Sequence, residues 1–210
     1  MKMQISYDFL NLPKALDLAK QTVQFTDILE VGAPLVYMEG IKAVETFKKQ
    51  FPNKPIFADI KIVDRVQQII QNFAEAGATY ISVLGGTSNF VIKKATEAAH
   101  KYNAKIALDL LNCYTVEQVV MDAHQLGVDL LIFHKPHDAG NALDLIEQWE
   151  TIKGNSSVPI FLAGGINPTN VKKILELKPD GIIVGTAINK SNNPALTASQ
   201  FYNLVKKENK

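Results

Sequence analysis

The sequence predicts a (β/α)8 TIM barrel. Eight short apolar runs rich in β-branched residues alternate with eight longer segments of helical periodicity. Four consecutive intervals between the predicted strand ends measure 25, 25, 25 and 29 residues. These strand ends are Asp59, Leu84, Asp109, His134 and Ala163. So regular a pitch favours a closed barrel over an open doubly wound sheet, and 210 residues lie near the lower size limit of that fold.

The eight predicted strands are apolar stretches bounded by polar residues, glycine or proline. In chain order they are Met3–Leu10, Ile28–Gly32, Ile56–Ile62, Tyr80–Leu84, Lys105–Leu111, Leu130–His134, Pro159–Ala163 and Gly181–Val184. Their number and even distribution predict one layer of parallel strands, each followed by a helix.

The segments between the strands carry apolar residues at i, i+3, i+4 and i+7, the periodicity of an amphipathic helix. Examples are Val66–Ala76, Val91–Tyr102, Val116–Leu126 and Val171–Leu177. We expect prolines in first helical turns and glycines at helix ends. The prolines are Pro13, Pro168 and Pro194, and the glycines are Gly77 and Gly127. No linker divides the chain, which predicts one barrel domain over residues 1–210.

The composition excludes several classes of function. The formal net charge is +1 and the positive residues are not clustered, so we expect no nucleic-acid partner. No run approaches 18 apolar residues, so we expect no membrane span. Cys113 is the only cysteine, and no apolar signal peptide precedes the first predicted strand. We therefore expect a cytoplasmic protein without a disulfide.

Five of the eight predicted strand ends carry an ionisable side chain. They are Asp8, Glu30, Asp59, Asp109 and His134. In a TIM barrel, the C-terminal ends of the strands form the active-site face, so these side chains are candidates for catalysis and binding. The alternative is that aspartate simply begins turns, but this explains Glu30 poorly and does not explain His134.

Glu30 and Asp59 end adjacent predicted strands, which indicates a metal site. Two carboxylates with open positions for water and substrate oxygens suit Mg²⁺, and the chain has no His/Cys constellation that would suggest zinc. The alternative is that both carboxylates accept hydrogen bonds from neighbouring loop amides.

Lys61 lies two residues after Asp59, so both side chains should point into the barrel mouth. Carboxylates on both sequence flanks favour its ammonium form, which predicts a fixed charge that stabilises an oxyanion rather than a Schiff-base nucleophile. A structural salt bridge is the alternative. Asp64 follows three residues later and, together with Gln67, is also consistent with a helix capping box.

Two glycine-containing loops predict a phosphate site. Gly164 and Gly165 follow the seventh predicted strand, and Gly185 and Thr186 follow the eighth. Loops at these positions commonly bind phosphate in TIM barrels, although a Gly-Gly pair can also serve only to make a turn. Arg65 is the only arginine, so we expect backbone amides and Thr186 to hold the phosphate.

His134 ends the sixth predicted strand and is a candidate general acid or base, because its reference pKa lies near neutrality. His137 lies in the following loop, where it is as easily a solvated residue as a functional one. Cys113 has no activating base near it in sequence, and we expect it to be an ordinary packed thiol.

The segment Phe57–Asp64 resembles the Asp-x-Lys-x-x-Asp motif of the orotidine-phosphate decarboxylase superfamily. The resemblance extends to Ile28–Pro34, Glu39–Gly40, Val83–Gly85, Ala163–Ile166 and Ile183–Gly185. It implies that Glu30 and Asp59 bind Mg²⁺, for which Mn²⁺ could substitute. It also implies a homodimer in which Asp64 reaches the partner's site.

Within this superfamily, the chain is most similar to the hexulose-phosphate synthase branch. Keto-gulonate-phosphate decarboxylases carry two arginines and a glutamate where this chain has Thr186, His137 and Asp109. Arg65 and Lys135 also differ from the residues common in the family, and neither they nor His137 is assigned a role.

The resemblance implies a reversible condensation of formaldehyde with D-ribulose 5-phosphate through a metal-stabilised enediolate. Lys61, Asp64 and His134 would be catalytic, while Asp8 and Asp109 would orient hydroxyl groups. The alternatives are decarboxylation of 3-keto-L-gulonate 6-phosphate, or a sugar-phosphate-binding protein without catalysis.

Overall fold

A computed structural model confirms the (β/α)8 barrel and describes residues 1–111, 113–135 and 146–207. Eight parallel strands close in sequence order, with β1 paired to both β2 and β8. They are β1 (Lys2–Tyr7), β2 (Ile28–Val31), β3 (Ile56–Ile62), β4 (Tyr80–Leu84), β5 (Lys105–Asp109), β6 (Leu130–His134), β7 (Ile160–Ala163) and β8 (Gly181–Val184).

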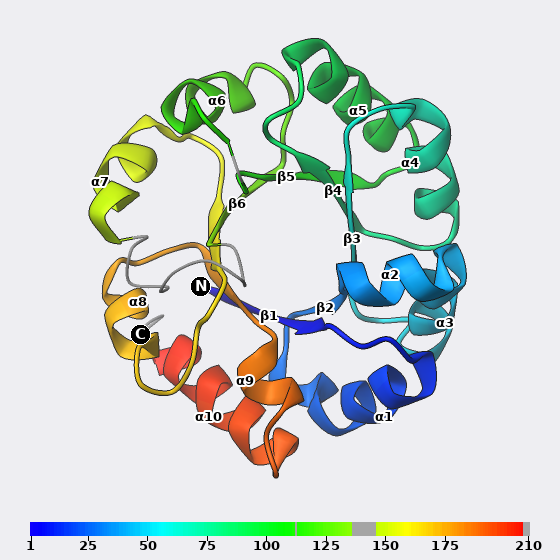
Figure 1. The fold of residues 1–210 in the computed structure, drawn as a ribbon, viewed down its shortest axis with the longest axis vertical. Coiled ribbons are helices and arrows are strands. Elements are labelled where there is room, and N and C mark those ends of the chain that lie inside the picture. Colours follow the sequence, from blue (N-terminus) through cyan, green and yellow to red (C-terminus); the bar gives the residue numbers. More distant parts are fainter. Residues whose placement is uncertain (112, 136–145, 208–210) are drawn as a thin grey trace.

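Helices form a ring outside the strands (Figure 1). They are α1 (Leu12–Thr22), α2 (Ala33–Glu39), α3 (Ile41–Gln50), α4 (Val66–Glu75), α5 (Asn89–Lys101), α6 (Val116–Ala123), α7 (Ile146–Asn155), α8 (Val171–Glu176), α9 (Thr186–Asn189) and α10 (Pro194–Lys207), with a 3-10 turn η1 at Val23–Phe25. The expectation of one helix after each strand was wrong after β2 and β8. Gly40, at φ +61°, separates α2 from α3, and short α9 precedes α10.

Most of the predicted helix boundaries agree with the structure to within two residues, but α6 ends at Ala123 rather than Leu126. Pro13 lies in the first turn of α1, where Asn11 accepts a hydrogen bond from the Lys14 amide at 3.1 Å. Pro194 begins α10. Gly77 and Gly127 follow α4 and α6 with left-handed φ values of +97° and +82°, as expected for glycines at helix ends.

The expectation for Pro168 was wrong, because α8 begins only at Val171. The side chain of Asn167 accepts a hydrogen bond from the Thr169 amide at 2.9 Å. This closes a local Asx turn around Pro168 and delays the start of the helix.

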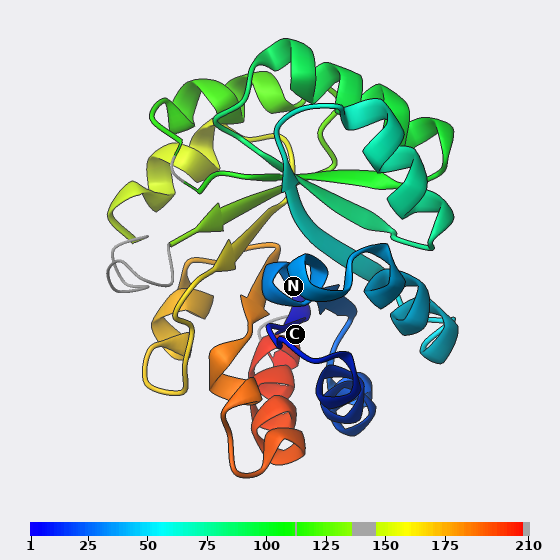
Figure 2. The same cartoon turned by 45° about the vertical axis from the view of Figure 1, so that its right-hand side comes forward.

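The main core lies between the strands and the surrounding helices. Its largest wholly buried side chains include Trp149, Tyr7 and Phe47. Helices α1 and α10 lie side by side and pack together, so the first and last helices complete the ring (Figure 2). The described part of the chain contains no helix with the length and apolar character needed to cross a membrane.

Strand β3 departs from regular pairing in a way that shapes the barrel mouth. Ala58 pairs with Ile81 of β4, and the next pair joins Ile62 to Val83, so the chain of β3 bulges between them. Lys61 takes a left-handed φ of +45° within this bulge. The segment carrying the Asp-x-Lys sequence is therefore held in a non-repetitive conformation.

Candidate active site

A cavity of about 670 Å³ opens at the C-terminal ends of the strands. Apolar side chains of the barrel interior, among them Phe57 and Ile183, lie at its base. Every predicted site residue except Asp64 lines this cavity. These residues are Asp8, Glu30, Asp59, Lys61, Asp109, His134, Gly164, Gly165, Gly185 and Thr186.

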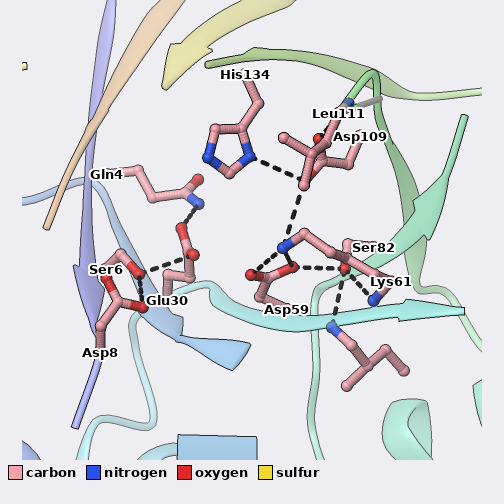
Figure 3. Close-up of polar contacts among 11 residues, drawn as sticks. Gln4, Ser6, Asp8, Glu30, Asp59, Lys61, Ser82, Asp109, Leu111 and His134 are labelled. Carbon is pink, nitrogen blue, oxygen red and sulfur yellow. Dashed lines mark hydrogen bonds and ion pairs between the residues drawn. The ribbon is translucent and has the colours of Figure 1, made fainter. Parts of the chain in front are cut away.

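Glu30 is buried on β2, with both carboxylate oxygens held by side chains of β1 (Figure 3). Ser6 Oγ donates to Glu30 Oε1 at 2.8 Å, and Gln4 Nε2 donates to Glu30 Oε2. Burial and the nearby charges of Asp59 and Asp8 raise the pKa of Glu30 to about 8, although the hydrogen bonds from Gln4 and Ser6 oppose this shift. The carboxylate is thus fixed in position and crowded by like charge.

Asp59 and Lys61 form a close ion pair within the bulge of β3. Lys61 Nζ lies 2.7 Å from Asp59 Oδ1 and 2.5 Å from Asp59 Oδ2. Ser82 Oγ accepts hydrogen bonds from the amides of Ile60 and Lys61 at 2.9 and 2.8 Å. The same hydroxyl donates to Asp59 Oδ1 at 2.9 Å, so Ser82 fixes both the backbone and the carboxylate.

The loop-amide alternative for Glu30 and Asp59 was wrong, because the hydrogen bonds to both carboxylates come from side chains. Burial alone would lower the pKa of Lys61, but Asp59 and Asp109 raise it above its usual value. Lys61 is therefore an ammonium ion, as expected. Its second carboxylate partner is Asp109 on β5 rather than Asp64, its neighbour in sequence.

Asp109 joins Lys61 to His134 (Figure 3). Its Oδ2 lies 3.4 Å from Lys61 Nζ and 3.2 Å from His134 Nδ1, and its Oδ1 accepts the Leu111 amide at 2.9 Å. Burial would raise the pKa of Asp109, but the hydrogen bond with His134 and the charges of His134 and Lys61 lower it. The carboxylate thus stays ionised and orients the imidazole, leaving Nε2 as the ring nitrogen not engaged with Asp109.

Asp8 directly follows β1 and fits between two glycines. A Cβ at Gly32 would lie 2.1 Å from Asp8 Oδ1, and one at Gly185 would lie 2.7 Å from Asp8 Oδ2. Ser6 Oγ also lies 3.0 Å from Asp8 Oδ1, so its single hydroxyl hydrogen is shared between Asp8 and Glu30. The Asp8 carboxylate thus occupies space that a side chain at Gly32 or Gly185 would fill.

The donor set of this cavity fits a magnesium ion. Glu30 and Asp59 lie on adjacent strands, and Mg²⁺ in proteins is commonly bound through one or two carboxylates, with water and substrate completing its shell. Burial, followed by the charges of Asp59 and Asp8, raises the pKa of Glu30, and a bound divalent cation would favour its ionised form. In the described residues, no group of three or more His, Cys, Asp or Glu side chains is arranged as a fuller ligand set.

The loops after β7 and β8 form the opposite end of the cavity. Gly164 has a φ of +91°, and a Cβ there would lie 2.1 Å from the Lys135 carbonyl oxygen, so backbone packing already requires glycine. Gly165 has a φ of +65°. The amides of Gly165 and Ile166 donate to no other residue that the structure describes, which leaves them available to an anion.

Asp64 is exposed on the rim of the barrel and does not line the cavity of its own chain. The capping-box interpretation was wrong. Helix α4 begins after Arg65, which has a left-handed φ of +53° and makes no side-chain cap. His137, to which no role was given, lies outside the described residues.

Sequence reasoning missed Gln4, Ser6, Ser82 and Lys190. The first three are buried polar residues of β1 and β4, and each holds a carboxylate. For Gln4 and Ser6, the signal was the alternation Gln4, Ser6, Asp8 in an otherwise apolar segment, which places three polar side chains on one face. Lys190 lines the cavity after α9 and carries no comparable signal.

Known proteins resemble this chain in sequence and fold along nearly their whole length. The profile of the "Orotidine 5'-phosphate decarboxylase / HUMPS family" matches residues 1–201. A 3-hexulose-6-phosphate synthase of Bacillus subtilis is 35% identical over 207 residues, covering 98% of this chain and 99% of its own.

Solved structures agree with the sequence relatives. The crystal structure of 3-hexulose-6-phosphate synthase from Salmonella typhimurium has a TM-score of 0.92 at 31% identity, covering 99% of this chain and all of its own. That of a 3-keto-L-gulonate-6-phosphate decarboxylase from Vibrio cholerae has a TM-score of 0.85 at 25% identity, covering 98% of this chain and 97% of its own.

Proposed function

Because the chain belongs to the orotidine 5′-phosphate decarboxylase/HUMPS family, we propose that it is an aldolase for formaldehyde and D-ribulose 5-phosphate. The product is D-arabino-hex-3-ulose 6-phosphate. The relatives named as 3-hexulose-6-phosphate synthases, at 31% and 35% identity, support this reaction over decarboxylation. The Asp109 carboxylate, in contact with both Lys61 and His134, is the observation that carries the proposal.

Glu30 and Asp59 would hold a magnesium ion, or Mn²⁺, which takes similar oxygen ligands. When bound, the ion supplies positive charge to the oxygens of the ketose. The hydrogen bonds from Gln4, Ser6 and Ser82 keep both carboxylates in place, so the site is organised before substrate arrives.

The aldol step needs a proton removed from C1 of the ketose. His134 accepts that proton at Nε2, because its Nδ1 faces the Asp109 carboxylate. The Lys61 ammonium stabilises the negative charge that develops on the ketose oxygen. C1 then bonds to the carbon of formaldehyde, and the new alkoxide is protonated to give the C1 hydroxyl of the product. Asp8 and Asp109 orient substrate hydroxyls.

The direct test is to follow formaldehyde consumption by the purified protein with D-ribulose 5-phosphate, first with Mg²⁺ and then with excess chelator. We expect consumption that stops on chelation and returns when Mg²⁺ is restored. No consumption in either condition contradicts the aldolase proposal. CO₂ release from 3-keto-L-gulonate 6-phosphate would then identify a decarboxylase, and its absence would favour a binding protein.

The proposal includes a homodimer formed through the cavity face. Large apolar side chains are exposed in the segments that follow strands β1 to β5, which lie on the cavity side of the barrel. They are Leu10, Tyr37, Met38, Val63, Phe90 and Tyr114. Exposed apolar groups on one face are typical of a surface that is buried by association. Asp64, beside Val63, would then enter the partner's site.

Subunit complementation tests this arrangement. Asp59→Asn and Asp64→Asn variants should each be inactive alone, but a mixed dimer contains one site with both residues intact. We expect activity to reappear after the two variants are unfolded and refolded together. Mixed subunits that stay as inactive as either variant would show that Asp64 does not act across the interface.

A further inference from the structure

The two ends of the cavity differ in whether the lysine that lines them forms an ion pair with another residue in the described part of the chain. Lys61 and Lys190 are the lysines among the residues that line it. Lys61 lies within 3.4 Å of both Asp59 and Asp109, so its charge is already compensated. Lys190 forms no ion pair with any residue in the described ranges, and its side chain is exposed to the cavity mouth.

The position of Lys190 is fixed by its backbone. Its amide donates to the Thr186 carbonyl at 3.0 Å, one helical turn earlier. The preceding residue, Asn189, donates from Nδ2 to the Ser6 carbonyl at 2.9 Å, which ties α9 to β1. Side chains in a helical turn lean towards its N-terminus, so the stem of Lys190 leads back towards Thr186.

A cation at this end of the cavity would strengthen the binding of a dianion. The Asp8 carboxylate lies against Gly185, at the edge of the same loops. Amide groups of Gly165 and Ile166 supply dipoles but no net charge, and the only arginine, Arg65, is not among the residues that line the cavity. A free lysine beside Thr186 would offset Asp8 and favour an anionic group over a hydroxyl.

We propose that Lys190 binds the phosphate group of the sugar phosphate and selects phosphorylated over unphosphorylated ketoses. The inference deepens the proposed function and rests on it for the identity of the sugar. Lys190 pairs with the phosphate as a point charge, while Thr186 Oγ1 and the amides of Gly165 and Ile166 donate hydrogen bonds.

The test compares Lys190→Ala with Lys190→Arg and with Lys172→Ala. Lys172 is an exposed lysine of α8 that does not line the cavity, so its variant removes the same charge elsewhere. We expect Lys190→Ala to raise the KM for D-ribulose 5-phosphate about tenfold, the loss expected for one charge-assisted contact, with little change in kcat. Lys190→Arg should stay within about threefold of the wild type, and Lys172→Ala should be unchanged.

Two further measurements separate phosphate recognition from a general defect. With unphosphorylated D-ribulose, wild type and Lys190→Ala should have equal kcat/KM, because the contact is absent in both. Calorimetric titration with inorganic phosphate should show about tenfold weaker binding by Lys190→Ala. This titration applies even if the protein fails to consume formaldehyde. Equal affinity of wild type and Lys190→Ala for inorganic phosphate would overturn the inference.

Discussion

The two ends of the cavity consist of different chemical groups. At the carboxylate end, ionisable side chains of β3, β5 and β6 contact one another, and Ser82 holds Asp59. Gln4 and Ser6 hold Glu30 of β2. At the glycine end, the loops after β7 and β8 present backbone amides, Thr186 and Lys190. In the proposed function, the first end carries out the chemistry and the second binds the phosphate group.

This difference predicts two kinds of mutational response. A side-chain change at the carboxylate end removes charge from a network whose backbone is independently fixed, so catalysis should fail while the fold survives. A change at the glycine end meets closely packed backbone, so stability should fall together with binding. Substitutions at Asp59, Gly164 and Gly154 test this distinction.

The largest effect is expected for Asp59→Asn. The substitution keeps the shape of the side chain but removes the charge that pairs with Lys61 and that would bind the metal ion. We expect kcat to fall by about 10²–10³-fold, comparable to the loss of one electrostatic contact in other active sites. Steady-state kinetics at saturating Mg²⁺ measure this effect.

The fold should persist in Asp59→Asn, because Lys61 keeps Asp109 as a partner and Ser82 still holds the bulge of β3. Thermal unfolding followed by circular dichroism provides the control. A variant that loses its fold together with its activity would contradict the roles given to this end of the cavity. A variant that keeps full activity and metal dependence would contradict them as well.

The next effect concerns Gly164→Ala. An alanine there would combine a φ of +91° with a Cβ placed 2.1 Å from the Lys135 carbonyl oxygen. We expect the free energy of unfolding to fall by about 2–4 kcal/mol, through backbone strain at Gly164 and displacement of the Lys135 carbonyl. Urea denaturation measures the change, and the KM for the sugar phosphate should rise with it.

The smallest effect is expected for Gly154→Ala, the matched control. Gly154 lies in α7, has no left-handed φ, and a Cβ there would meet nothing within 4 Å. Alanine should stabilise this helix by about 0.5–1 kcal/mol without altering kinetics. If Gly164→Ala, like Gly154→Ala, lowered neither the free energy of unfolding nor the affinity for substrate, the close backbone packing at Gly164 would not be required for the site.

Much of the fold could be predicted from the sequence because strand signals are local. The predicted strands end at Leu84, His134, Ala163 and Val184 in agreement with the structure, since each apolar run stops where the chain leaves the barrel. β1 ends at Tyr7 rather than Leu10, because pairing with β2 reaches only as far as Val31. The residue at which this pairing stops cannot be predicted from the local sequence, because the two strands are far apart in the chain.

From the sequence, the site could be predicted as a set of ionisable residues at the ends of strands. The local sequence pattern predicts eight alternating strands and helices. It therefore also predicts that five ionisable side chains lie on one face, namely Asp8, Glu30, Asp59, Asp109 and His134. This follows because the parallel strands of a barrel all end on the same side.

Which of these groups are in contact depends on how the barrel packs in three dimensions. This packing paired Lys61 with Asp109 across two strands, placed Asp8 between Gly32 and Gly185, and brought Lys190 into the cavity. Such contacts depend on the bulge of β3, the closure of the barrel and the close approach of backbone segments. These features arise from packing between segments that are far apart in the sequence.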